Sequence, residues 1–84
     1  MAERKIKRIK FEVKRKLGSL PNNSQVWKKE LNLVSWDDRE PVYDLRLWKM
    51  DTEQPGKGIT LTKEELKELV MIIKDELRRL VNNR

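Results

Sequence analysis

The spacing of apolar residues changes once along this 84-residue chain, near Thr62. Up to that point, apolar residues alternate with polar ones in short runs, a pattern that predicts β-strands. Beyond it, from Leu66 to Val81, they recur at helical spacing, which predicts one amphipathic helix. Thr62 and Glu65 have the spacing of a capping box, in which each side chain accepts a hydrogen bond from the other's backbone amide. The chain therefore has the pattern of an α+β domain in which strands come first and a single helix follows.

Four segments before the helix carry strand-like patterns and are separated by turn-forming residues. We expect strands at residues 11–17, 25–36, 42–48 and 57–61. The second of these fits no single alternation, because Trp27, Leu31 and Leu33 share one parity. Val34 and Trp36 share the other, and a β-bulge within this strand would reconcile the two sets. The expected architecture is a four-stranded antiparallel sheet followed by one C-terminal helix (β-β-β-β-α).

The expected strand at 42–48 separates into two faces, because side chains alternate across a strand. The apolar face consists of Tyr43, Leu45 and Leu47. We expect the helix to cover this face, which leaves Arg46 and Trp48 open to solvent on the other. There Arg46 could pair with a phosphate and Trp48 could stack on an unpaired base. The alternative is that Trp48 folds over a sheet edge and Arg46 pairs with Asp44, a pairing that could also orient Arg46 for a ligand.

The chain contains no cysteine and no histidine. This excludes disulfides, thiolate or imidazole metal sites, a cysteine nucleophile and a histidine base. The carboxylates lie mostly in expected turns or on the polar side of the helix, and no nucleophile–base pair or phosphate-binding loop is visible. We therefore expect no enzymatic activity, no cofactor, no metal and no small-molecule substrate.

We expect no membrane-spanning segment and no export signal in this chain. No apolar run approaches the ~18 residues of a membrane span, and no apolar signal-peptide core follows the basic N-terminus. We expect no membrane partner and a cytoplasmic location, associated with the nucleoid in a bacterium.

The net charge of +6 is concentrated at the start of the chain. Residues 1–16 contain eight Lys or Arg side chains against Glu3 and Glu12, whereas basic and acidic residues balance in the remainder. A basic segment on a neutral body suits a polyanionic partner, although lysine-rich segments also simply keep small domains soluble. We expect residues 1–9 to form a basic, flexible arm and residues 10–84 to form a binding and dimerisation domain.

The second expected strand offers a tryptophan beside a lysine, whichever of its parities meets a ligand. Its tryptophans and lysines are Trp27, Trp36, Lys28 and Lys29. Asn32 is a further polar candidate. Each tryptophan taken alone is more often a core residue than a ligand contact. The chain nevertheless has more tryptophan than a small core needs, so this strand is a candidate part of a binding surface.

Two apolar residues of the expected helix, Met71 and Ile72, lie outside its main apolar stripe, on opposite flanks. A domain this small, without disulfides or metals, often depends on association for its stability. We therefore expect a homodimer in which two helices pair about a twofold axis. The alternative is a wide stripe that the sheet uses entirely. The expected interface residues are Leu66, Leu69, Val70, Met71, Ile72, Ile73 and Leu77.

Two motifs resemble the signature of a known family. They are Y-D-L-R-L-W at residues 43–48 and, after a short loop, P-G-K-G-I-T-L-T at residues 55–62. In this order they resemble the positive cofactor 4 family of transcriptional coactivator domains, and residues 27–36 resemble its bacterial YdbC-like branch. The resemblance covers about residues 11–80. It implies a strongly curved four-stranded sheet, a dimer formed through the helices, and single-stranded DNA bound across the sheets with little sequence preference.

The resemblance also implies roles for individual residues. By motif position, Arg46 matches a DNA-contacting arginine, Lys57 matches the basic residue before the last strand, and Trp48 lies near a stacking aromatic. The expected function is binding of single-stranded DNA in transcription or in DNA replication or repair. The alternatives are an RNA-binding or RNA-chaperone module and a protein-interaction domain that uses the tryptophan-bearing sheet. The candidate nucleic-acid-binding residues are Arg46, Lys57, Trp48, Lys28, Lys29, Trp27, Asn32, Trp36, Lys49, Lys14 and Lys16.

Overall fold

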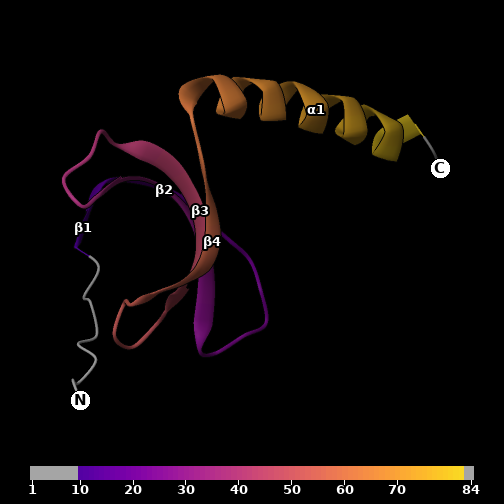
Figure 1. The fold of residues 1–84 in the computed structure, drawn as a ribbon. Helices are drawn as coiled ribbons and strands as arrows, with labels where there is room; N and C mark the ends of the chain where they lie inside the picture. Colours follow the sequence, from indigo (N-terminus) through magenta and orange to yellow (C-terminus); the bar gives the residue numbers. More distant parts are fainter. Residues whose placement is uncertain (1–9, 83–84) are drawn as a thin grey trace, which may run out of the picture.

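The computed structural model describes residues 10–82, which form one antiparallel sheet and one helix. The elements are β1 (Phe11–Leu20), β2 (Trp27–Trp36), β3 (Val42–Lys49), β4 (Pro55–Leu61) and α1 (Lys63–Asn82). The strands lie in the order β1-β2-β3-β4, and the sheet is strongly curved (Figure 1). This confirms the predicted four-stranded sheet followed by one helix. The expected arm at residues 1–9 lies outside the described residues.

The central strand β2 pairs with β3 without interruption, from Trp27 opposite Lys49 to Val34 opposite Val42. The β-bulge that would have reconciled the two parities is therefore absent from the pairing of β2 with β3. Its apolar side chains break the alternation because β2 carries apolar residues on both of its faces. The irregularities lie instead in the edge strands: β1 has two shifts of register against β2, and β4 has one against β3. Bulges increase local twist, and their position in the edge strands is consistent with the curvature of the sheet.

The β2–β3 connection, residues 37–41, begins with a tight turn in which both central residues have positive φ. Asp37 has a φ of 51° and Asp38 a φ of 61°. The backbone N–H of Arg39 donates to the carbonyl of Trp36 at 2.9 Å, which closes the turn. Turns of this type suit the twist of a hairpin and normally have Asn, Asp or Gly at the first central position and Gly at the second. Asp38, at the position where Gly is usual, therefore carries some backbone strain.

Helix α1 begins at the predicted capping box. The Thr62 N–H donates to Glu65 Oε1 at 2.9 Å, and the Glu65 N–H donates to Thr62 Oγ1 at 3.0 Å. Only the start of the helix contacts β3 and β4, where Leu66 and Leu69 are half-buried. The rest extends away from the sheet (Figure 1). Within residues 10–82, no helix is long and apolar enough to cross a membrane.

The expectation that the helix covers the apolar face of β3 is wrong. Thr62 alone separates the end of β4 from the start of α1. A connection this short fixes the direction in which the helix leaves, so it does not fold back over the sheet. The face that carries Tyr43, Leu45 and Leu47 therefore stays partly exposed.

The core of the domain lies within the curve of the sheet. We call this side the inner face; its strand positions are Phe11, Val13, Lys16, Lys28, Glu30, Asn32, Val34, Trp36, Val42, Asp44, Arg46 and Trp48. We call the opposite side the outer face; its positions are Trp27, Lys29, Leu31, Leu33, Tyr43, Leu45, Leu47, Ile59 and Leu61. Among the described residues, the buried apolar side chains are Val34 and Trp48, and three of the four buried polar ones lie on the inner face. A sheet that buries one face by curving needs no covering layer on that face.

Candidate functional site

Three aromatic side chains form a cluster on the inner face. The ring centroid of Phe11 lies 5.5 Å from that of Trp36 and 5.5 Å from that of Trp48, with tilted planes. Such separations are favourable for aromatic pairs. The β1–β2 pairing places Phe11 opposite Trp36 and so brings the start of β1 over the tryptophans.

Trp48 was expected to be exposed on an open sheet face, and this is wrong. Only 6% of its surface is accessible, because Phe11 packs against it and the sheet curves around it. Phe11 and Trp36 are the half-buried members of the cluster and present their remaining surface to solvent. A contact between Trp48 and a nucleic acid stays a prediction.

Arg46 is held in place by Asp44, which is fully buried. Arg46 Nε donates to Asp44 Oδ1 at 2.9 Å, and Nη2 donates to Oδ2 at 2.8 Å. Nη1 donates to the carbonyl of Gly56 at 2.9 Å, which ties β3 to β4. The guanidinium carbon also lies 4.7 Å from the ring centroid of Trp36, within cation–π distance. The pairing that the sequence left as an alternative is therefore present, and two of the five guanidinium N–H groups are left over.

The glycines of the P-G-K-G segment make room for two large side chains. A Cβ at Gly56 would lie 2.7 Å from Trp27 Cζ3, because that indole packs over β4 on the outer face. A Cβ at Gly58 would overlap the Cα and Cβ of Arg46. The two glycines of this sequence motif are thus also required by packing, because any side chain there would collide with Trp27 or Arg46. Lys57, between the two glycines, is exposed.

A second buried carboxylate, that of Glu30, lies further along the inner face. Asn32 Nδ2 donates to Glu30 Oε1 at 3.0 Å, and Lys28 Nζ pairs with Oε2 at 3.2 Å. Burial acts to raise the pKa of Glu30. The hydrogen bonds from Asn32 and Lys28, together with the charges of Lys28 and Lys16, outweigh burial and lower this pKa below its ordinary value. Glu30 is therefore ionised at neutral pH.

Two cavities adjoin the aromatic cluster. The first has a volume of about 310 Å³ and is lined by Phe11, Trp48, Lys16, Lys28 and Glu30 and by the β3–β4 loop. The second, of about 300 Å³, is lined by Trp36, Arg39, Glu40, Val42, Arg46 and Thr60. Cationic and aromatic side chains thus surround both spaces, an arrangement suited to a ligand with negative charges and flat rings.

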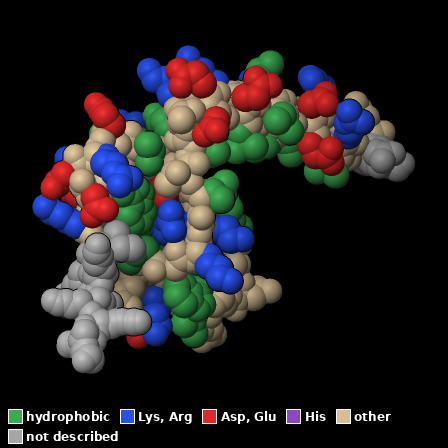
Figure 2. Space-filling model, in the orientation of Figure 1, with side chains coloured by type: hydrophobic (Ala, Val, Ile, Leu, Met, Phe, Trp, Pro, Cys, Tyr) green, Lys and Arg blue, Asp and Glu red, His purple; other side chains and the backbone are tan. Residues whose placement is uncertain are grey.

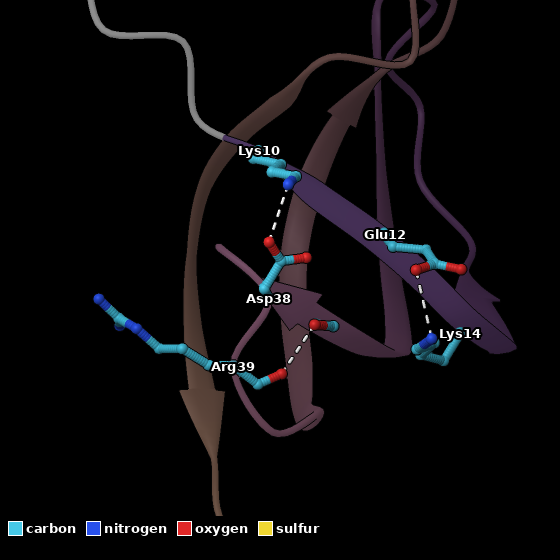
Figure 3. Close-up of polar contacts among 6 residues, drawn as sticks. Lys10, Glu12, Lys14, Asp38 and Arg39 are labelled. Carbon is cyan, nitrogen blue, oxygen red and sulfur yellow. Dashed lines mark hydrogen bonds and ion pairs between the residues drawn. The ribbon is translucent and has the colours of Figure 1, made fainter.

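The edge near the β2–β3 turn carries basic residues that are already paired (Figure 3). Lys10 Nζ lies 2.8 Å from Asp38 Oδ2, and Lys14 Nζ lies 3.2 Å from Glu12 Oε1. The hydrogen bond and charge of Asp38 raise the pKa of Lys10. The side chain of Arg39 points away from these pairs (Figure 3).

The predicted site residues fall into two groups. The inner face brings together Arg46, Trp48, Trp36, Asn32, Lys28 and Lys16. Trp27 and Lys29 lie on the outer face, so Lys28 and Lys29 do not belong to one site. Lys49 lines the first cavity, whereas Lys14 pairs with Glu12. The binding roles of these residues stay predictions.

Sequence reasoning missed Phe11 and Glu30 as site residues. Phe11 joins the cluster through pairing between β1 and β2, and the two shifts of register in β1 hide that pairing from any simple alternation. Glu30 could have been found, because it lies between Lys28 and Asn32 on the same face of one strand.

Apolar side chains also gather along α1, on the side turned toward the sheet, while charged groups crowd its opposite side (Figure 2). None of its residues is buried. The residues expected at a dimer interface include half-buried Leu66 and Leu69; those exposed are Val70, Met71, Ile72, Ile73 and Leu77. The apolar stripe of the helix is thus uncovered within the described chain.

Comparison with known proteins adds two matches. A sequence model of the family described as Transcriptional Coactivator p15 (PC4) matches residues 23–72, which contain β2, β3, β4 and the first half of α1. An uncharacterized protein of Treponema pallidum (strain Nichols) is 41% identical over 56 residues, or 67% of this chain. The aligned part is 66% of that protein's length, slightly under two thirds. The family match leaves out β1, which supplies Phe11 and Lys16 to the inner face.

Proposed function

The chain belongs to the Transcriptional Coactivator p15 (PC4) family, and we propose that it binds single-stranded DNA on the inner face of its sheet. This family is a non-catalytic, DNA-binding one. The observation that carries the proposal is the position of the Phe11–Trp36–Trp48 cluster beside the fixed guanidinium of Arg46. We assign the protein to transcription or to DNA replication or repair, the processes that expose single strands.

Phosphate groups of the strand would meet a set of positioned cations. Lys16, Lys28 and Lys49 line the first cavity, and Arg46 has two N–H donors left beside the second. Charge-assisted bonds from such groups to phosphate are strong and release condensed counterions. Buried carboxylates hold Lys28 and Arg46 in place, so little side-chain entropy is lost when they contact the strand.

Bases of the strand would stack on Phe11 and Trp36, which are only half-buried. Stacking of one base on an aromatic side chain contributes about 1–3 kcal/mol and tolerates any base. Trp48 would then act by supporting Phe11 from below rather than by stacking. Because neither stacking nor phosphate contacts depend on the identity of the base, such binding would have little overall sequence preference.

We further propose that the protein works as a homodimer through α1. The helix leaves Ile73 and Leu77 about half exposed, at 46% and 53%, in a stripe with Leu66 and Leu69. A second copy presents the same stripe, so a twofold axis can bury both at once. Molar-mass measurement by light scattering in solution tests this, and a monomer at working concentration would contradict it.

The binding proposal is tested by fluorescence anisotropy with a labelled oligo-dT and a duplex of the same length. We expect the single strand to bind more tightly and its affinity to fall steeply with salt. The double variant Phe11→Ala, Arg46→Ala should lose most of this affinity, whereas Lys67→Ala, which removes one charge from exposed α1, should not. Equal binding of duplex and single strand, or intact binding by the double variant, would contradict the proposal.

RNA is the competing ligand, because stacking and phosphate contacts are common to both single strands. A competition titration with DNA and RNA oligomers of matched sequence separates the two. We expect DNA to compete at least as well as RNA; much tighter RNA binding would make the protein an RNA-binding module.

A further inference from the structure

Glu30 is an unusual residue for a surface that binds a polyanion. Its carboxylate lines the first cavity, it is 7% exposed, and its lowered pKa keeps it charged. A negative charge that only repelled phosphates would weaken binding. A carboxylate can instead accept hydrogen bonds from the N–H groups of a base.

The hydrogen bonds of Glu30 leave one acceptor position on each oxygen. An ionised carboxylate has about four lone-pair sites, two on each oxygen. Asn32 occupies one site on Oε1 and Lys28 one on Oε2. The remaining pair is suited to two parallel N–H donors.

Guanine is the natural base that presents two adjacent N–H donors on its Watson–Crick edge, at N1 and N2. Its O6 acceptor lies next to them, where the ammonium of Lys28 or Lys16 can donate. Adenine and cytosine present one exocyclic amino group there, and thymine a single N–H between two acceptors. We propose that the first cavity is a guanine-selective subsite in which Glu30 accepts hydrogen bonds from N1 and N2 and a lysine donates to O6.

The size of the cavity agrees with a purine. A cavity of ~150 Å³ holds a benzene ring, and this one, at about 310 Å³, has room for a bicyclic base. Phe11 supplies flat apolar surface at its wall, and Trp48, which also lines the cavity, packs against Phe11. The proposal rests on the proposed function and adds one selective position to an otherwise sequence-tolerant mode of binding.

The first test uses the unmodified protein and a series of oligo-dT probes, each with one central substitution by dG, dI, dA or dC. Inosine keeps N1–H and O6 but lacks the N2 amino group. We expect the dG probe to bind about tenfold more tightly than oligo-dT, as for a good bidentate base contact, and the dI probe to fall between them. A dG probe that binds no more tightly than the dA probe would overturn the subsite.

The second test compares Glu30→Gln with Glu53→Gln. Both remove one negative charge from the lining of the same cavity, but Glu53 is exposed in the β3–β4 loop. We expect Glu30→Gln to reduce the dG-to-dT affinity ratio to about one and Glu53→Gln to retain it. Loss of the ratio in both variants would show an effect of net charge and overturn the assignment. Failure of every probe to bind the unmodified protein would instead contradict the proposed function itself.

Discussion

The inner face of the sheet and helix α1 differ in how they bury apolar surface, which a chain this small can do only to a limited extent. The inner face buries Val34 and Trp48 and satisfies buried charges within the same chain, as Asp44 does for Arg46. The helix buries none of its residues and keeps Leu77 53% exposed. The inner face is therefore packed by the sheet's own residues, whereas the helix has an apolar stripe that only another surface can cover.

This difference suggests that the proposed binding depends on the inner face and the proposed assembly on the helix. A strongly curved sheet can present cations and aromatic rings without help from the helix, and the helix can pair without disturbing the inner face. Variants in one region should leave the property of the other unchanged.

The largest effect is expected from Asp44→Ala. It leaves the guanidinium of Arg46 without its buried partner, and breaking such a pair costs about 3–5 kcal/mol. Urea unfolding measures the change in the free energy of unfolding. Asp75→Ala is the matched control on α1, because Asp75 pairs with exposed Arg78 and Arg79, and exposed pairs contribute at most about 1 kcal/mol. Equal losses in both variants would remove the distinction between the regions.

Gly58→Ala should destabilise the sheet by about 3 kcal/mol, since the new Cβ overlaps Arg46 and forces the strands apart. Gly18→Ala provides the control, because a Cβ there has no neighbour within 4 Å. Thermal unfolding of both proteins gives the comparison. A Gly58→Ala protein as stable as Gly18→Ala would show that β3 and β4 do not approach as closely as described.

In the proposed dimer, Leu77→Ala should weaken association by about 2 kcal/mol per copy, from the apolar surface no longer buried. Sedimentation equilibrium measures the dissociation constant. Glu76→Ala, also exposed on α1, should leave that constant nearly unchanged. The monomeric fraction of Leu77→Ala should still bind oligo-dT through its inner face, and complete loss of binding by folded monomers would contradict the separation of the two regions.

The smallest effect is expected when the pH is lowered, and it concerns the contribution of Glu30 to stability. Because the pKa of Glu30 is lowered from 4.5 in the folded protein, ionised Glu30 stabilises the fold above about that pH, and this contribution is lost as the pH falls through the lowered value. The stability difference between the unmodified protein and Glu30→Gln should thus be constant at neutral pH and change below pH 4.5. A difference that stays constant into strong acid would show that Glu30 is not held by Lys28 and Asn32.

Local signals in the sequence predicted the fold well. The capping box at Thr62 and Glu65 and the alternation of residues 42–48 depend on neighbours along the chain, and both the helix start and β3 lie where they were expected. The direction of the helix was not predictable, because it depends on how β4 ends in space. Without that direction, the face of β3 with Tyr43, Leu45 and Leu47 was expected to be covered, whereas the opposite face is the more buried one.

The site was predicted in part, for a related reason. Alternation alone placed Arg46 on the face opposite Tyr43, Leu45 and Leu47, and the pairing of the strands shows it there. The burial of Trp48 and the arrival of Phe11 depend on curvature and on two shifts of register in β1, which are properties of the whole sheet. Long-range pairing therefore decided which aromatic rings stay partly open to solvent.

Chemical-shift mapping with oligo-dT tests the central claim most directly, because it reports separately on the two regions. Titration of the isotope-labelled protein should shift the backbone amides of Phe11 and Trp36 and the side-chain signals of Arg46, on the inner face. The polar side of α1, sampled at Lys67 and Glu68, should be unaffected. Shifts confined to α1 or to the outer face around Leu31 would contradict binding on the inner face.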